Sequence, residues 1–147
     1  MHHFDPSGRL LRSWGTSGSG PGEFNLPHNI CCDKDGWLYV ADRENSRIQI
    51  FDSLGRFETQ INNMHRLSGL ALTRGSFPDF NMAGLASYLA VNGNLLNLGP
   101  FVSFFNTNGS LVSRLNAEKG RGLGPGQFVS PHSIALDGSG DIVRTDW

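Results

Sequence analysis

Short apolar runs follow one another along the chain, each with polar residues at alternate positions, and turn-forming residues separate them. Alternation with a period of two residues is typical of strands that have one buried face. Asp-Gly and similar pairs between the runs indicate tight turns, because glycine readily adopts positive φ. The clearest group of runs predicts four short antiparallel strands, at residues 28–32, 37–42, 47–51 and 57–61.

A second group of apolar runs starts at residues 67–72, and a third follows Pro131. In the second group, the next strand is predicted at residues 88–91. The stretch before it, residues 74–87, is rich in Gly, Pro and Phe and is predicted to be a long loop. The remaining strands of the two groups are predicted at residues 101–105 and 110–115, at the residues after Pro131, and at residues 141–146.

One stretch of 23 residues occurs twice, at residues 20–42 and 124–146, without a gap and with ten identical pairs. Both copies contain Gly-Pro-Gly-x-Phe, followed by Pro-His-x-Ile at the start of an apolar strand. A second motif, Phe-Asp-x-x-Gly-Arg, occurs at residues 4–9 and 51–56, and more loosely from Phe105 onwards. Self-similarity at this spacing indicates repeated structural units of about fifty residues.

Four short antiparallel strands in each unit are typical of one blade of a β-propeller. The prediction is therefore an all-β fold, a partial propeller of about three four-stranded blades across residues 1–147. Propellers usually close with about four to eight blades. The chain is expected to be a fragment of a longer product, or to complete itself by self-association through open blade edges. The predicted units cover residues 1–18 (partial), 19–63, 64–116 and 117–147 (partial).

Composition supports short strands and tight turns over helices. Charged residues are 17% of the 147, below the usual ~25%, and glycine contributes 19 residues, about twice its usual share. Twelve basic residues are scattered among thirteen acidic ones, with a formal net charge of −1, so no basic face is expected to recruit nucleic acid. No apolar run approaches the length of a membrane span.

The two cysteines, Cys31 and Cys32, are adjacent in sequence. Neighbouring residues in a strand point to opposite faces, so the two cysteines are expected to remain separate thiols. They therefore do not indicate whether the protein resides in an oxidising or a reducing compartment. The N-terminus lacks the apolar run of a signal peptide, and the chain itself gives no localisation.

The motifs Phe-Asp-x-x-Gly, Gly-Pro-Gly-x-Phe, Pro-His-x-Ile and Val-Ala-Asp-Arg-Glu-Asn-Ser-Arg-Ile-Gln together resemble NHL repeats. Within these repeats, the chain is similar to peptidyl-α-hydroxyglycine α-amidating lyase (peptidylamidoglycolate lyase), a six-bladed propeller. The narrower similarity rests on the stretch from Phe24 to Gln49, on Leu-Ala-Val-Asn-Gly at residues 89–93, and on Pro-His-Ser-Ile from Pro131. The chain corresponds to roughly the C-terminal half of that propeller.

The resemblance implies a zinc ion on the propeller axis, held by three histidines, and cleavage of peptidyl-α-hydroxyglycine into an amidated peptide and glyoxylate. His28 and His132 match two of the ligands, and Arg43 matches an arginine that faces the substrate. The third histidine, a second arginine and the proposed base, a tyrosine, belong to family segments that precede Phe4. The resemblance also implies a secreted or periplasmic location.

Two positions beside His132 depart from the family pattern. Ser133 replaces an aspartate that contacts calcium in the family, so calcium is not expected here. Ser130 replaces a methionine, which changes the lining of the metal pocket.

Propeller geometry gives a physical reason to group these residues. The innermost strands line a central channel, so His28 and His132, at equivalent places in their units, are expected to approach one region of it. Imidazoles are suitable Zn²⁺ ligands, and catalytic zinc sites commonly use three protein ligands and one open position. An arginine nearby would bind a terminal carboxylate in bidentate fashion.

Structural explanations remain for the same residues. The histidines would serve equally well as caps of the channel that hydrogen-bond to backbone. Arg43 would serve as the partner of Glu44, or of an acidic residue in a neighbouring blade, in an ion pair that stabilises the turn. His65 is a further, weaker candidate for the missing ligand. The alternative function is a non-catalytic NHL propeller that binds a peptide or protein on one rim, and RNA binding ranks behind both. The third ligand, the base, the preferred metal, the substrate and the oligomeric state stay open.

Overall fold

The computed structural model describes residues 1–72, 82–86 (as backbone), 100–106, 109–115, 121–137, 139 and 141–146. This part of the chain is built of β-strands and one short 3-10 helix, η1 (Arg43–Asn45). The strands are β1 (His2–Phe4), β2 (Leu10–Ser13), β3 (Thr16–Ser17), β4 (Glu23–Phe24), β5 (Pro27–Cys32), β6 (Leu38–Asp42), β7 (Arg47–Phe51), β8 (Phe57–Ile61), β9 (Leu67–Leu72), β10 (Met82–Ala86), β11 (Phe101–Phe105), β12 (Leu111–Leu115), β13 (Pro131–Leu136) and β14 (Ile142–Asp146).

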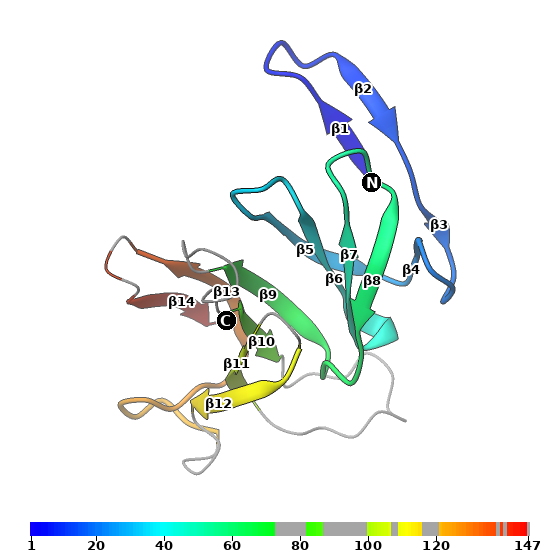
Figure 1. Cartoon of the computed structure of the whole chain (residues 1–147). Helices are drawn as coiled ribbons and strands as arrows, with labels where there is room; N and C mark the ends of the chain where they lie inside the picture. Colours follow the sequence, from blue (N-terminus) through cyan, green and yellow to red (C-terminus); the bar gives the residue numbers. More distant parts are fainter. Residues whose placement is uncertain are drawn as a thin grey trace.

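Two four-stranded antiparallel sheets form the body of the molecule (Figure 1). Their strand orders are β5-β6-β7-β8 and β9-β10-β11-β12, so each sheet is a simple meander. Two antiparallel pairs, β1-β2 and β13-β14, stand at either end, and the short pair β3-β4 is parallel. These sheets confirm the predicted all-β partial propeller. No helix in the described part of the chain is long and apolar enough to cross a lipid bilayer.

The predicted position of the second strand in the β9–β12 sheet is wrong. Residues 82–86, placed within a long loop by the sequence, form β10 and pair with both β9 and β11. Met-Ala-Gly-Leu-Ala has little local strand propensity, and the pairing is imposed by the neighbouring strands, which often outweigh such preferences. The strand predicted at residues 88–91 lies outside the described residues.

Apolar faces between neighbouring sheets form the core. Between the two four-stranded sheets lie Tyr39, Ala41, Ile48, Ile50, Met64, Leu67, Leu70 and Phe105. A second cluster joins the β9–β12 sheet to β13-β14 through Ala71, Val102, Phe128 and Ile134. A third buries Phe24, Val40 and Phe51 on the other face of the first sheet. The sheets therefore pack face against face, as neighbouring blades do.

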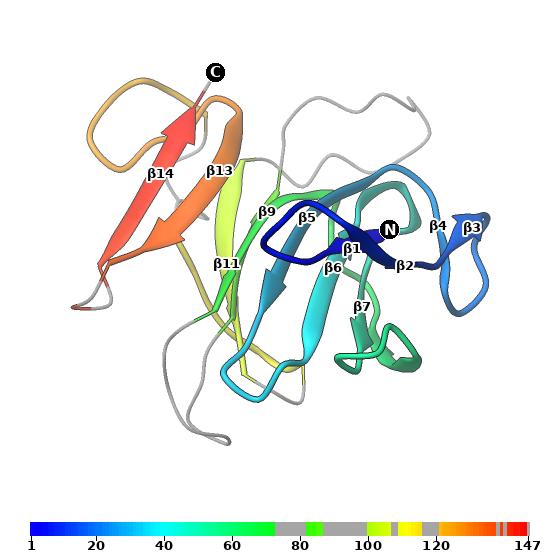
Figure 2. The same cartoon turned by 90° about the horizontal axis from the view of Figure 1, so that it is seen from above.

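The first strands of the successive sheets lie together in the middle of the molecule. β9 contacts β5 on one side and β13 on the other, and the view from above shows β5, β9 and β13 in this order (Figure 2). These are the strands that begin with Pro27-His28, Leu67-Ser68 and Pro131-His132. Equivalent positions in three sheets are therefore brought to one region.

Candidate functional site

The residues that precede each histidine fold in the same way in both copies of the 23-residue repeat. A glycine loop, residues 20–24 in one copy and 124–128 in the other, turns through a glycine with positive φ, Gly22 or Gly126. The side chain of Glu23 accepts a hydrogen bond from the Gly20 amide at 2.8 Å, and Gln127 does the same for Gly124 at 3.0 Å. The loop is thus closed by its own side chain before the strand begins.

An aspartate at the same distance along the sequence from this loop in both copies then fixes the start of the strand that carries the histidine. Asp42 accepts the backbone amide of Asn25 at 2.8 Å, whereas Asp146 accepts the amides of Val129 and Ser130 at 2.9 and 2.6 Å. Both aspartates end the second strand of their pair, and Pro27 and Pro131 lie opposite them. The two histidines follow directly, so the repeat gives them equivalent positions.

The rings of His28 and His132 meet edge to face, with centroids 5.0 Å apart and planes at 76°. Sequence reasoning predicted this approach, and the structure brings the two residues together. The pKa of the His132 imidazole lies below its usual value. Burial is the largest cause, followed by the charges of His28 and of Arg43. A neutral imidazole is the form that can ligate a metal.

Ser68 connects the two histidine strands, and sequence reasoning did not assign it a role. It occupies the corresponding position on β9 and is almost fully buried. Its carbonyl oxygen lies 2.9 Å from Nδ1 of His28, and its hydroxyl donates to the carbonyl of Pro131 at 2.9 Å. Because a carbonyl only accepts, Nδ1 of His28 is the donor of this hydrogen bond, which leaves Nε2 as the ring nitrogen that could bind a ligand.

Arg43 lies in η1, directly after β6, and its side chain is 11% exposed. Its Nε is 3.5 Å from Oε1 of Glu44, too far for a hydrogen bond, and Nε has no hydrogen-bond partner in the described part of the chain. Burial first, and then the charge of Arg66, lower the pKa of the Arg43 guanidinium, while Glu44 raises it. The ion pair with Glu44 that sequence reasoning offered as a structural role is therefore present.

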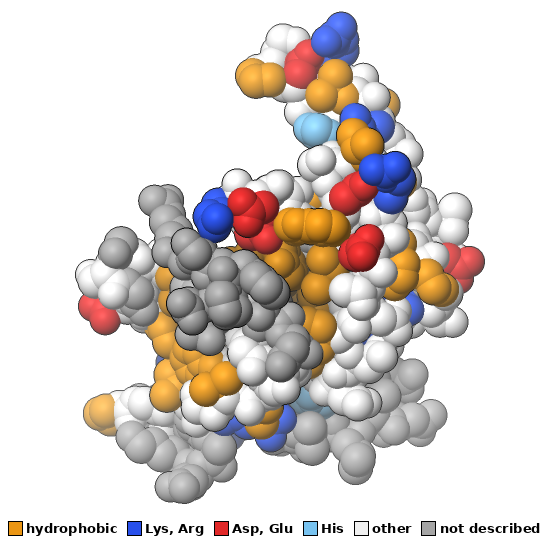
Figure 3. Space-filling view, viewed as in Figure 1, with side chains coloured by type: hydrophobic (Ala, Val, Ile, Leu, Met, Phe, Trp, Pro, Cys, Tyr) orange, Lys and Arg blue, Asp and Glu red, His pale blue; other side chains and the backbone are white. Residues whose placement is uncertain are grey.

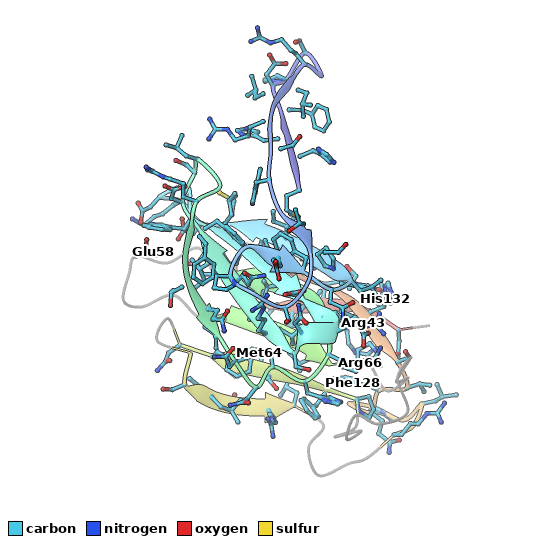
Figure 4. The ribbon with its side chains drawn as sticks, turned by 90° about the vertical axis from the view of Figure 1, so that its right-hand side faces the viewer. Arg43, Glu58, Met64, Arg66, Phe128 and His132 are labelled. Atoms are coloured by element: carbon cyan, nitrogen blue, oxygen red, sulfur yellow. The ribbon has the colours of Figure 1, made fainter. Side chains whose placement is uncertain are left out.

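Arg66 joins Arg43 and Glu44 in a cluster of three charged side chains. In the sequence, only the charges of these residues indicate the cluster. Nη2 of Arg66 donates to the same Oε1 of Glu44 at 2.6 Å, and Arg66 is almost fully buried. One carboxylate thus stands between two guanidinium groups, so the cluster keeps a net positive charge. Figure 4 labels Arg43, Arg66 and His132, which lie on the same side of the molecule. An anionic group is the complementary ligand for such a cluster.

His28 and His132 are the two candidate metal ligands that the structure brings together. Among the described residues, no group of three or more His, Cys, Asp or Glu side chains is arranged to hold a metal ion. His65, considered as a substitute third ligand, does not join the pair; its ring lies beside Phe101, with centroids 6.3 Å apart. Imidazoles are suitable zinc ligands, and a zinc site at this pair would need further ligands besides the two histidines.

Much of the Asp-Arg-Glu-Asn-Ser-Arg-Ile-Gln motif proves to be structural. The carboxylate of Asp42 is fully buried and accepts from Asn45, Arg47 and Gln49 at 2.8 to 3.1 Å. We call these four residues the Asp42 clamp. It holds the glycine loop against the sheet through hydrogen bonds to the carbonyls of Gly18, Ser19, Gly20 and Glu23.

The adjacent cysteines are both free thiols, as predicted. Cys31 faces the core, where burial, together with Cys32 and Asp33, raises the pKa of its thiol to about 12. Cys32 is exposed. A thiol with a raised pKa is a poor nucleophile and metal ligand, which agrees with packing as the role of Cys31.

A family model for the NHL repeat matches residues 24–51. Over 97% of its length, the chain is 30% identical to peptidyl-glycine alpha-amidating monooxygenase B and 42% identical to form A, both from Xenopus laevis. It spans 16% and 15% of those proteins, about one sixth of their length. Human NHL repeat-containing protein 3 is 53% identical over 29% of the chain and 12% of that protein.

Among solved structures, a Bacteroides fragilis protein matches with a TM-score of 0.61 and 18% identity, over 97% of this chain and 38% of that one. This likeness supports the fold. The chain therefore contains an NHL repeat and is homologous, over nearly its whole length, to part of the amidating monooxygenases.

Proposed function

We propose that this chain contributes two zinc ligands and a substrate-binding arginine to a peptidylamidoglycolate lyase-like site. The reaction is the cleavage of peptidyl-α-hydroxyglycine to an amidated peptide and glyoxylate. The single observation that carries the proposal is that the rings of His28 and His132 lie together, with centroids 5.0 Å apart, although they come from two repeats. Homology to part of the amidating monooxygenases supports a role related to peptide amidation.

The histidines would hold the zinc ion through ring nitrogens. In His28 the proton is fixed on Nδ1 by the Ser68 carbonyl, so Nε2 is the available ligand atom. Burial, together with His28 and Arg43, lowers the pKa of His132, which favours the neutral form of the ring that can bind a metal. A zinc ion bound there would supply Lewis acidity, which lowers the pKa of a coordinated hydroxyl or water. The base that receives the hydroxyl proton is not among the residues assigned here.

Arg43 would bind the carboxylate at the glycine end of the substrate. Its guanidinium is largely buried, so a charge-assisted hydrogen bond to a carboxylate would be stronger than on an exposed surface. Glu44 and Arg66 restrict its position from one side. The carboxylate would thereby orient the carbinol carbon toward the histidines, which is a positioning contribution to catalysis.

The alternative function is a non-catalytic NHL propeller that binds a peptide or protein. The Asp42 clamp favours this alternative, because much of the stretch that matches the NHL repeat holds the blade together. Human NHL repeat-containing protein 3 shares the repeat at higher identity than the amidating monooxygenases, although over a shorter stretch. The match to NHL repeats therefore suits both functions, and the histidine pair distinguishes them.

Metal dependence of substrate binding is the test. A peptide ending in α-hydroxyglycine is titrated into the chain with and without Zn²⁺, and into Arg43→Ala. The lyase-like site predicts binding that requires zinc and is weakened at least tenfold in Arg43→Ala. Arg12→Ala, at an arginine on β2, serves as the control and should bind as the wild type does. Binding that is indifferent to zinc and to Arg43 would overturn the proposal and favour the interaction module.

A further inference from the structure

Two arginines share the carboxylate of Glu44, but only one of them is hydrogen-bonded to it. Nη2 of Arg66 lies 2.6 Å from Oε1 of Glu44, whereas Nε of Arg43 lies 3.5 Å from the same oxygen. The side chains of Arg66, Glu44 and Arg43 are 1%, 12% and 11% exposed. Within the described part of the chain, Nε of Arg43 is a buried donor without a hydrogen-bond partner. The carboxylate is thus bound to Arg66, and Arg43 keeps a donor for another acceptor.

The backbone holds Arg66 beside η1. Met64, two residues earlier, is buried and donates its amide to the carbonyl of Ser46, directly after η1, at 2.8 Å. The amide of Glu44 donates to the carbonyl of Asn25 at 3.1 Å, which ties η1 to the segment before β5. Arg66 itself has a φ of 32°, a left-handed conformation that is unfavourable for arginine and persists only where the surroundings hold the residue. The backbone of Arg66 is therefore fixed relative to Glu44.

Exposed charges on this protein are arranged differently from this buried cluster. On the face shown in Figure 3, basic and acidic side chains lie side by side at the surface. Lys34 and Asp35, for example, form a one-to-one pair at 3.3 Å, and both side chains are more than half exposed. In the buried cluster, Arg43 and Arg66 share one acid, Glu44, away from the screening effect of water. A ligand anion is therefore the group that would balance its charge.

We propose that Arg66 is a positioning residue for Arg43: it binds the carboxylate of Glu44 and so leaves the Arg43 guanidinium available to the carboxylate of a ligand. Without Arg66, Glu44 would turn to Arg43, the remaining cation of the three, and would compete with the ligand for it. Arg66 acts only through Glu44 and does not touch the ligand. This inference rests on the carboxylate-binding role proposed for Arg43, and it does not depend on the zinc ion.

The test compares two ligands that differ by one charge. A peptide that ends in glycine with a free carboxylate is titrated into the protein without zinc in a calorimeter, and the methyl ester of the same peptide is titrated in parallel. Neither ligand carries the hydroxyl group of the proposed substrate. The wild type is expected to bind the acid about tenfold more tightly than the ester, and Arg43→Ala is expected to bind both about equally. A general loss of structure would weaken both ligands and leave their ratio unchanged.

Substitutions of Arg66 and Glu44 then separate positioning from direct contact. Arg66→Met removes the charge and is expected to lower the preference for the acid about fivefold or more. Adding Glu44→Gln removes the competing carboxylate and is expected to restore the preference to within about threefold of the wild type. Arg66→Lys keeps the charge and should retain the preference. Arg56→Met, which breaks the surface pair with Asp52, is the matched control and should leave it unchanged.

Folding of each variant is checked by circular dichroism and urea unfolding. The Arg66→Met/Glu44→Gln variant replaces both partners of a buried pair, a change that proteins often tolerate better than the loss of one partner. If Arg66→Met alone does not fold, this double variant is compared with Glu44→Gln. The same preference for the acid in both is expected, because Arg66 has no role once the carboxylate is gone. A lower preference in the double variant would show that Arg66 contacts the ligand itself and would overturn the inference.

The remaining outcomes separate this inference from the proposed function. A preference for the acid that Arg66→Met leaves unchanged, or that Glu44→Gln does not restore, would overturn the inference alone. A wild type that binds acid and ester equally would overturn the role of Arg43 in the proposed function and this inference with it. A preference that follows the substitutions as expected, in a protein that takes up no zinc, would contradict only the zinc site of the proposed function.

Discussion

The two copies of the 23-residue repeat have nearly the same backbone pairing but different surroundings. In the first copy, Asp42 is fully buried, and Arg47 and Gln49 from the next strand bond to it. In the second copy, Asp146 is partly exposed and bonds to two backbone amides and to Arg144. The outer strands that complete the first copy are absent from the second among the described residues.

Even so, His28 and His132 lie at equivalent positions of their copies, and their rings are in contact. The glycine loop, the proline and the aspartate that contacts backbone amides before the inner strand are features that the two copies share. In the first copy, Arg47 and Gln49 on β7 also hold the glycine loop through hydrogen bonds to its carbonyl groups. The difference separates the residues that build the candidate site from those that build the blade.

Replacing Arg47 is expected to cause the largest difference in stability between the two copies. Arg47→Ala would leave the buried Asp42 carboxylate without its cation and would remove hydrogen bonds to the glycine loop, so a loss of about 3–5 kcal/mol is expected. Arg144→Ala, in the second copy, removes a partly exposed ion pair, a hydrogen bond to the Gln127 carbonyl and a contact with the Phe128 ring, and is expected to cost about 1–2 kcal/mol. Urea unfolding measures both. Equal losses would show that the two copies are held in the same way.

The outer hairpins offer a second contrast through their turn glycines. Gly8 and Gly55 both have positive φ, so alanine at either is expected to cost about 1–2 kcal/mol. A Cβ at Gly55 would also lie 2.9 Å from the Trp14 ring, whereas a Cβ at Gly8 meets nothing within 4 Å. Gly55→Ala should therefore cost about 1 kcal/mol more than Gly8→Ala in thermal or urea unfolding. The reverse order would contradict the packing of Trp14 on that hairpin.

Removing the Ser68 hydroxyl tests the link between the two copies. Ser68→Ala leaves the buried Pro131 carbonyl without this donor and is expected to cost about 1–2 kcal/mol. Ser113→Ala, on the exposed strand β12, is the control and should change the free energy of unfolding by less than about 0.5 kcal/mol. A neutral Ser68→Ala would mean that β9 and β13 are held together by apolar packing alone.

The smallest expected effect is the pH dependence that comes from Asp146. Burial raises the pKa of this carboxyl, but the amides of Val129 and Ser130 and the charge of Arg144 outweigh it, so its pKa lies below the usual 3.8. Its stabilising contribution is present above pH 3.8 and is lost as the pH falls through the lowered value. Asp146→Asn should remove this part of the acid loss, less than about 1 kcal/mol. Unfolding curves at pH 7 and in acid would contradict it if the two proteins lose stability equally.

Sequence reasoning predicted the elements in which local pattern and tertiary structure agree. The β5–β8 sheet, the β13-β14 pair and the approach of His28 to His132 all follow from alternation, turn residues and repeat spacing. β10 was misplaced, because Met-Ala-Gly-Leu-Ala owes its strand conformation to its neighbours.

The charged cluster and the clamp could not be predicted in the same way. Arg66 meets Glu44 across 22 positions of the sequence, and no local pattern marks such a pair. The role of Ser68 likewise depends on contacts with two other strands, 40 and 63 positions away. Motif residues such as Arg47 and Gln49 were visible in the sequence, but only their burial identifies them as structural.

The most direct test of the account is the zinc content of the chain, measured by mass spectrometry of the metal on protein purified without chelators or an affinity tag. The account predicts that the wild type retains zinc, that His28→Ala and His132→Ala each lose it, and that His65→Ala, the matched control, keeps it. A wild-type chain that takes up no zinc, or a His28→Ala/His132→Ala double variant that retains as much as the wild type, would contradict the claim that these two histidines form a metal site.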